Sequence, residues 1–313
     1  MPCHTIVHRQ DWFLEESYRA RTDREELGFL ERSFELHFNE RPFLNHFSYL
    51  FITRTTKERM RQQSNFSVLC RGHILPREVR DKDSVLRFLE AVEQFERIIC
   101  DSGLVRLERL TTEEITGKGK EAGLVEKYFS LSQEDTTTLE DIRLGGAEMR
   151  IGDKRLSVHT LSDADDLPAA VRTDGRYEKY STDRSDCRLS FAAPVGLMLP
   201  HNHICNLYVF IDDPAETLRN FEKAARNMRS LSHYSRANEI NRQWTEEYLN
   251  EAHSFGLVPV RCHCNVMAWS EDRERLRNIR NDTGSALAQM GCKPRHNTVD
   301  APTLYWAGIP GGE

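Results

Sequence analysis

The sequence predicts an α+β protein in which mixed or antiparallel sheets are covered by packed helices. Between residues 258 and 268 every second residue is small or apolar, which is typical of a strand with one face on a core. A helix is predicted next, because apolar residues recur at steps of three and four: Leu276, Ile279, Thr283, Leu287 and Met290. Residues 303–308 predict a final strand, so the chain from residue 203 onward has the order of a ferredoxin-like split β-α-β fold.

The first part of the chain predicts strands and helices in turn. Residues 5–7 favour a short strand, and residues 43–53 predict a longer one whose far end is apolar on both faces. The helix predicted over residues 24–38 has one apolar side, formed by Leu27, Leu30, Phe34 and Phe38. The helix predicted over residues 84–100 has a buried stripe, formed by Leu86, Leu89, either Val92 or Glu93, Phe95 and Ile99.

The middle of the chain predicts shorter elements. Residues 104–110 alternate and predict a strand, and residues 123–131 predict a helix. Gly152 and Asp153 predict a hairpin turn leading into a strand that ends at residue 161. Residues 189–195 and 203–211 predict two further strands.

Asp213 is placed to begin a long helical region. Asp is a favoured N-cap, Pro214 occupies the first helical position and Glu216 the third. The region runs to residue 253 and is predicted to break near residues 230–234.

Three parts are predicted along the chain. Residues 1–161 form an N-terminal α+β lobe, from which residues 54–80 project as a basic excursion. Residues 162–188 are rich in charge and poor in apolar side chains, so we predict a connecting segment. Residues 189–313 form a β-α-β-α-β lobe.

Two groups of cations are the candidate partner-contact residues. The excursion over residues 54–80 holds seven Arg and Lys against two Glu, beginning with Arg54, Lys57, Arg59 and Arg61. The helix after Asp213 carries cations at steps of four, three and three, at Arg219, Lys223, Arg226 and Arg229. The structural alternative is a solvated loop and a solvated helix flank. The functional one is a surface for an acidic protein, lipid headgroups or single-stranded DNA.

The motifs of nucleotide hydrolysis are incomplete. The nearest candidate for a phosphate-binding loop begins at Gly117, but its spacing is wrong and Glu121 stands where a hydroxyl is needed. Asp212 follows an apolar run, like the acid that holds Mg²⁺ in nucleotide motors, although no phosphate loop accompanies it. We therefore predict no catalytic residue and no cofactor site.

Zinc and thiol chemistry are weighed against a packing role. Candidate ligands are Cys205, Cys262, His263, Cys264, Cys292, His201, His203 and His296. Cys262 and Cys264 alternate with apolar residues on the face predicted to be buried, where thiols behave as small hydrophobes. Their spacing is not that of a zinc knuckle. Cys187 has no flanking signature of a nucleophile. We predict no metal site.

Five long, irregular stretches carry a family resemblance that covers essentially the whole chain. They are residues 39–46 (NERPFLNH), 55–59 (TTKER), 90–97 (EAVEQFER), 181–196 (STDRSDCRLSFAAPVG) and 293–310 (KPRHNTVDAPTLYWAGIP). In these stretches the chain resembles the TraG-family conjugation ATPases of Bacteroides-type conjugative transposons, the motors of a type IV secretion apparatus.

The resemblance implies a role in DNA transfer. In that family such a region precedes the nucleotide-binding motor, so ATP and Mg²⁺ are expected only in a motor domain that would follow residue 313. Residues ahead of Met1 are also expected. We therefore expect a non-catalytic N-terminal domain that docks the motor on the apparatus and sets subunit contacts. The implied partners are other type IV secretion components, its own motor domain and copies of itself.

Composition bounds the remaining possibilities. A formal net charge of −6 argues against a protein built mainly to hold nucleic acid, although a single-stranded DNA-binding module remains the alternative. Eight cysteines in 313 residues are typical of a reducing compartment. No apolar run reaches the length of a membrane span or a signal peptide. The expected location is the cytoplasm, including the inner face of the inner membrane through the secretion complex.

Overall fold

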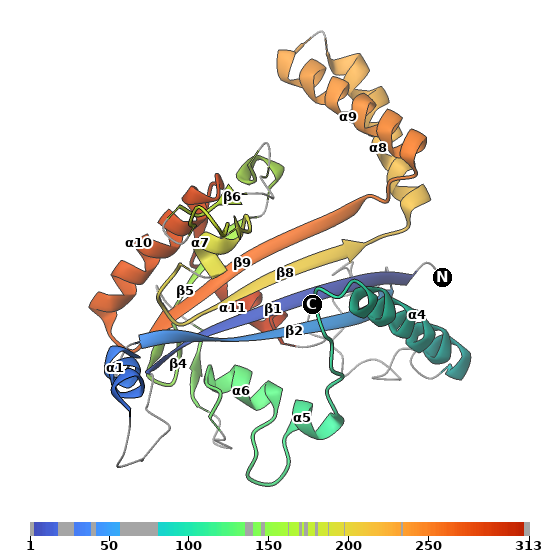
Figure 1. Cartoon of the computed structure of the whole chain (residues 1–313). Helices are drawn as coiled ribbons and strands as arrows, with labels where there is room; N and C mark the ends of the chain where they lie inside the picture. The colour runs from blue at the N-terminus through green and yellow to red at the C-terminus, as the bar shows by residue number, and fades with distance from the viewer. Residues whose placement is uncertain are drawn as a thin grey trace. The chain divides into compact units, whose positions relative to one another are not determined.

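The computed structural model confirms the α+β class, with a mostly antiparallel sheet and packed helices (Figure 1). The structure describes residues 3–17, 28–38, 42–56, 81–134, 140–144, 148–161, 163–168, 171, 175–178, 181–186, 188–196, 198–232 and 234–309.

Contacts divide the chain into two compact units, each assembled from three separate stretches. Unit 1 comprises Met1–His8, Phe51–Leu110 and Tyr208–Cys262, and unit 2 comprises Arg9–Leu50, Thr111–Leu207 and His263–Glu313. The long strands β1 (Cys3–Ser17), β2 (Pro42–Thr56), β8 (His203–Ile211) and β9 (Val260–Ser270) each contribute residues to both units. The predicted boundary at residues 162–188 stays a prediction, because much of that segment lies outside the described residues.

The main sheet has the strand order β2-β1-β8-β9-β5-β4-β3, and β10 also pairs with β5. The strands not yet defined are β3 (Ile142–Arg143), β4 (Met149–Ile151), β5 (Lys154–Leu161) and β10 (Arg295–Asn297). β4 and β5 form the predicted hairpin, in which Gly152 takes the positive φ of 55° that the turn requires. A separate two-stranded sheet joins β6 (Gly175–Arg176) to β7 (Arg188–Leu189).

The split β-α-β arrangement is confirmed within unit 2. β9 leads into α10 (Arg273–Gln289) and then β10, and β5 pairs antiparallel with both strands and so lies between them. The predicted final strand is wrong, however, because residues 303–307 belong to helix α11 (Ala301–Ala307). Pro302 suits the first turn of a helix, where its missing N–H costs nothing, and Tyr305 is fully buried.

Three other strand predictions need correction. The strand predicted over residues 5–7 is one end of the fifteen-residue β1. Residues 105–110 lie in no regular element. The strand predicted over residues 189–195 is confined to β7 and gives way to the short helix α7 (Ala193–Gly196), in which Pro194 has no N–H for a sheet.

Two clusters form the core of unit 2, on opposite faces of β5. One gathers Leu156 and Val158 with Trp12 and the stacked pair Tyr128 and Tyr305. It includes α6 (Leu124–Ser130), which confirms the helix predicted there and follows the capped turn α5 (Thr112–Thr116). The other cluster packs α10 against β5 and β9. A short 3-10 turn, η2 (Ala164–Asp166), is hydrogen-bonded to residue 293 beside it.

Several predicted helices are confirmed while their predicted burial is not. α1 (Phe29–Phe38) and α4 (Lys82–Asp101) form, but Phe34 and Leu86 are each 56% exposed and α4 has no buried residue. The apolar stripes of both helices are therefore largely open to solvent in the described part of the chain. The single buried face predicted for residues 258–268 is also wrong at its start. Val258 and Val260 are exposed, whereas β9 is buried on both faces from residue 265 onward.

Candidate partner-binding surface

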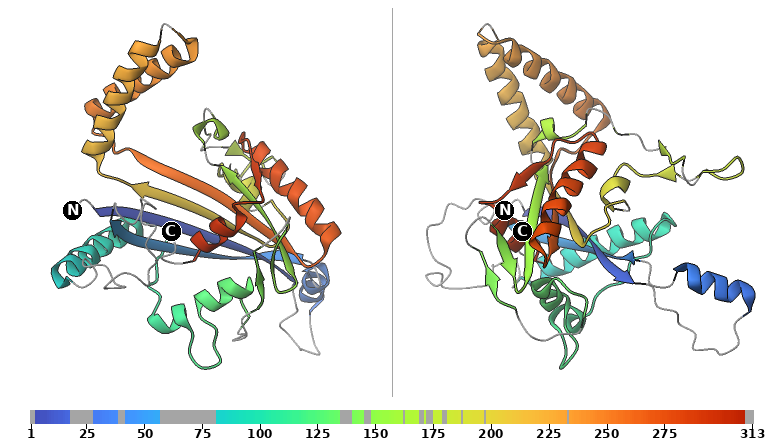
Figure 2. Two further views of the ribbon diagram at one scale, coloured as in Figure 1. Left: turned by 180° about the vertical axis from the view of Figure 1, so that it is seen from behind. Right: turned by 90° about the vertical axis from the view of Figure 1, so that its left-hand side faces the viewer.

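The candidate surface is a helical hairpin in unit 1, made of α8 (Pro214–Leu231) and α9 (Arg236–Phe255). Its first helix is capped as predicted, because the Asp213 carboxylate accepts hydrogen bonds from the N–H groups of Ala215 (3.0 Å) and Glu216 (3.2 Å). The predicted break is confirmed between the two helices. The two helices are in contact with each other (Figure 1), and they diverge from their shared turn in the right-hand view of Figure 2.

The two helices share a narrow apolar seam. The rings of Phe221 and Tyr248 meet edge to face, with centroids 5.5 Å apart, and Ala225, Leu249 and Ala252 are buried. A two-helix element of this kind buries little apolar area, so most of its side chains remain available for a partner.

A group of charged side chains connects the end of β8 with the start of β9, the two strands from which the hairpin extends. The Arg261 guanidinium donates to both Asp212 oxygens, at 2.8 and 3.3 Å, and His4 donates from Nδ1 at 2.6 Å. Burial alone would raise the pKa of Asp212, but the bonds from Arg261 and His4 lower it below its usual value. Arg261 also lies over the Phe210 ring.

The predicted helical cations form one exposed row on α8, which we call the basic ridge: Arg219, Lys223, Arg226 and Arg229. The row spans about 15 Å at the helical rise. None of the four makes an ion pair with a carboxylate of the described chain. Arg219 and Arg226 instead donate to carbonyl oxygens of their own helix, at 3.1 and 3.4 Å. The ridge therefore presents four positive charges that no carboxylate of the described residues neutralises.

Helix α9 presents a different outward row. Ile240, Trp244, Glu247 and Glu251 follow at steps of four, three and four, and Trp244 is 64% exposed. The sequence analysis did not identify this row. The signal that could have identified it is the pair Ile240 and Trp244, which are four residues apart and lie outside the buried stripe. Arg242 of α9, in contrast to the ridge cations, forms ion pairs with Glu239 and Glu246 at 2.6 Å each and is not available to a partner.

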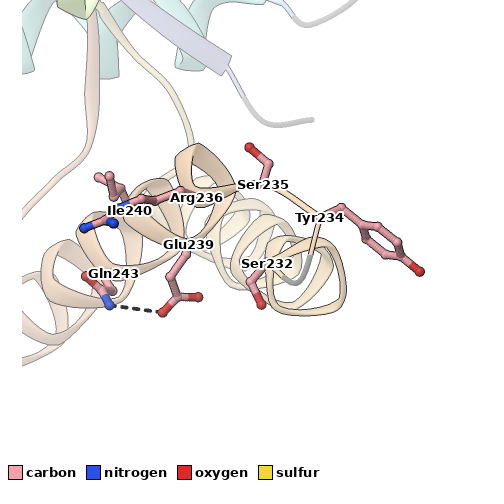
Figure 3. A pocket seen from close by; sticks show the side chains of 7 residues that line it. All are labelled: Ser232, Tyr234, Ser235, Arg236, Glu239, Ile240 and Gln243. Carbon is pink, nitrogen blue, oxygen red and sulfur yellow. Dashed lines mark hydrogen bonds between the residues drawn. The ribbon is translucent and has the colours of Figure 1, made fainter.

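The turn between the helices holds a shallow hollow (Figure 3). Its lining is mostly polar and comprises Ser232, Tyr234, Ser235, Arg236, Glu239, Ile240 and Gln243. Gln243 donates to Glu239 at 3.0 Å, which fixes two of these side chains. Tyr234 points away from the hollow and is 85% exposed. An exposed aromatic side chain at the end of the hairpin is typical of a contact residue.

The other predicted contact residues are mostly outside the described residues. Arg54 lies exposed near the end of β2. Lys57, Arg59 and Arg61, with the rest of the excursion up to residue 80, are not described. Their contribution to a partner surface stays a prediction.

The cysteines do not share one environment. Cys262, predicted to be buried, is exposed, whereas Cys264 is half-buried. Burial raises the pKa of the Cys205, Cys262 and Cys292 thiols, which keeps them protonated at neutral pH and weak as nucleophiles. In the described stretches no three His, Cys, Asp or Glu side chains are grouped to hold a metal ion. No helix within those stretches has the length and apolar character to cross a bilayer.

No protein-family model matches this sequence, and no curated protein matches it significantly.

Proposed function

We propose that this chain is the non-catalytic N-terminal domain of a conjugative-transfer ATPase of the TraG family. In this role it docks the motor on a type IV secretion apparatus, and the chemistry belongs to a separate motor domain that binds ATP and Mg²⁺. Partners are other components of the apparatus, its own motor domain and further copies of the chain. The stretches at residues 39–46, 181–196 and 293–310 support this parentage by their resemblance to that family.

The observation that carries the docking role is the basic ridge. Four exposed cations that pair with no described carboxylate suit an acidic protein surface, because opposite charges steer association and fix register. Trp244 and Tyr234 on the same hairpin add the exposed aromatic side chains that dominate binding energy in protein interfaces.

A second candidate function is binding of single-stranded DNA. Exposed aromatic side chains together with a row of cations are what sequence-tolerant binding of single strands uses. Trp244 on α9 and the basic ridge on α8 supply both on one hairpin. The net charge of −6 favours the protein partner over the nucleic acid.

The test is reversal of the ridge in the natural conjugative element, with R219E, K223E, R226E and R229E combined. We expect the transfer frequency to fall by roughly tenfold or more, because like charges placed across an interface cost several kcal/mol. The matched control reverses four exposed cations on other helices, R32E, R87E, R97E and R277E, and changes the net charge equally. Equal transfer by the two variants would contradict the docking role.

Salt titration separates the two candidates. Affinity for a labelled single strand should fall with a log-log slope of about 0.7 per phosphate contacted if the ridge binds DNA. A docking domain should give no ridge-dependent DNA binding even at low salt. Steep salt dependence that is lost in the ridge variant would favour the DNA-binding candidate instead.

A further inference from the structure

A second basic group lies in unit 2, beneath α10. His159 on β5 stands directly opposite His296 on β10 and Val266 on β9 in the sheet register. Residues directly opposite one another project from the same face of a sheet. Because Val266 packs with Ala286 and Leu287, that face is the one covered by α10. The two imidazole rings are 5.2 Å apart and tilted by 58°.

The third residue of this group, after His159 and His296, is Arg280 on helix α10. Arg280 and Gly284 are four residues apart and therefore lie on the same side of the helix. A Cβ on Gly284 would lie 4.0 Å from His159 Nε2, so the helix backbone comes close to the ring there. The Arg280 charge acts on both His159 and His296 and lowers the pKa of each, in addition to the lowering by burial. We call Arg280, His159 and His296 the basic cluster.

The cluster has buried polar atoms without partners, and no carboxylate of the described residues balances its charge. His159 is 4% exposed, and its Nδ1 atom has no hydrogen-bond partner among the described residues. The same holds for the buried Nε of Arg280 and for the hydroxyl of Ser157, which is two residues from His159 on the same face of β5. No described carboxylate forms an ion pair with Arg280. Buried polar atoms without partners are rare in folded proteins, and these three, on β5 and on the helix that covers it, indicate a polar group from outside the chain.

We propose that the basic cluster binds the phosphate group of a small ligand, which enters from the exposed His296 side. A guanidinium presents a fork of donors that matches the oxygens of a phosphate. Protonated imidazoles from β5 and β10 supply further donors, and the Ser157 hydroxyl supplies a neutral one. This site is independent of the docking role proposed for the hairpin.

The lowered pKa of His159 predicts a measurable consequence of phosphate binding. Burial, followed by His296 and Arg280, lowers the pKa of His159 to about 4, so that its imidazole is neutral at neutral pH. A bound phosphate dianion would favour the charged ring and raise this pKa. Phosphate binding should therefore be coupled to proton uptake by the cluster.

The experiment titrates inorganic phosphate into the purified chain at pH 6.5, against sodium chloride of matched ionic strength. Imidazole nitrogen signals are followed by NMR. We expect saturable shifts of the His159 and His296 signals and uptake of protons. The variant R280Q should bind phosphate roughly tenfold more weakly or worse, since a charge-assisted pair is lost. The control R277Q, an exposed position of the same helix, should bind as the wild type does.

A second arm replaces inorganic phosphate by a nucleoside monophosphate. Tighter binding of the nucleotide would identify an organic phosphate as the ligand, and equal binding would identify the phosphate group alone. H296A provides a further variant whose substitution lies at an exposed position and should not disturb folding. Shifts no larger than those in sodium chloride would overturn the proposal, as would equal phosphate affinity of R280Q and R277Q.

Discussion

A chain of buried amides sets the register of β1, β8 and β9 in unit 2, and its middle member can be removed. Gln10 Nε2 donates to Asn206 Oδ1 at 2.9 Å, and Asn206 Nδ2 donates to Asn265 Oδ1 at 2.9 Å. Gln10 also donates to the Gly308 carbonyl and accepts from the Trp12 indole, both at 2.8 Å. Each of the three amide side chains is at most 1% exposed.

The substitution N206L keeps the number and branching of the side-chain heavy atoms and removes both amide–amide hydrogen bonds. It leaves a donor of Gln10 and the acceptor of Asn265 buried without these partners. At about 1–3 kcal/mol for each orphaned group, the loss should be roughly 2–6 kcal/mol in the free energy of unfolding. The control N250L changes an exposed Asn of α9 and should stay within about 0.5 kcal/mol of the wild type.

Urea unfolding followed by tryptophan fluorescence measures the effect, since Trp12 is buried in contact with this chain of amides. A double-mutant cycle with N265L measures the contribution of the Asn206–Asn265 hydrogen bond separately. The double variant should lose less stability than the sum of the single losses, because the Asn206–Asn265 bond is then removed with both partners. A loss below about 1 kcal/mol for N206L, or strictly additive losses, would refute the reasoning.

Three further predictions concern the cap, the core and pH. D213A should destabilise the hairpin by about 1 kcal/mol, measured as faster amide hydrogen exchange in α8, with D213N retaining the cap. G308A should unfold unit 2 at lower urea concentration, because a Cβ there would come within 2.1 Å of the Tyr128 hydroxyl, and Y128F should relieve part of this loss. In phosphate-free buffer, stability should fall as the pH drops from about 6.5 to about 4. Over that range the unfolded chain binds a proton at His159 that the folded chain, with a pKa of about 4, does not. His159 accounts for about 3 kcal/mol of this loss at most. H159Q should therefore make the urea-midpoint profile less steep but not flat, because burial also lowers the pKa of His203 to about 4.

The elements that followed simple periodicity were predictable. Asp213 and Pro214 predicted the start of α8, and Gly152 predicted the turn of the β4–β5 hairpin, because helix caps and turns depend on only a few neighbouring residues. The split β-α-β unit was also predicted in kind, although its last strand was placed in α11. There a local apolar alternation was outweighed by Pro302 and by the burial of Tyr305 in a helix.

The sequence did not reveal that polar side chains are buried in the sheet. The inward face of β1 carries His4, His8 and Gln10 beside Ile6 and Trp12, so its alternation is not one of apolar side chains. Only the partners across the sheet, such as Asn206, make such a face stable, and these are distant in sequence. The basic cluster is hidden for the same reason, since His159 and His296 meet only through the pairing of β5 with β10.

The candidate partner surface was predicted in part. The spacing of the ridge cations identified the exposed flank of α8, because helical periodicity alone decides which residues share a side. Whether those cations have internal partners depends on the folded chain. The structure brings no described carboxylate to them. The exposure of Trp244 likewise depends on how α9 packs on α8.

The docking role is tested most directly by photocrosslinking from the ridge in donor cells that carry the natural element. A photoreactive amino acid replaces Lys223 on the ridge or, as control, Arg97 on α4, and the crosslinked products are identified by mass spectrometry. Our account predicts that position 223, and not position 97, crosslinks to an acidic surface of a type IV secretion component. Crosslinks to single-stranded DNA alone, or no product that depends on the ridge position, would contradict it.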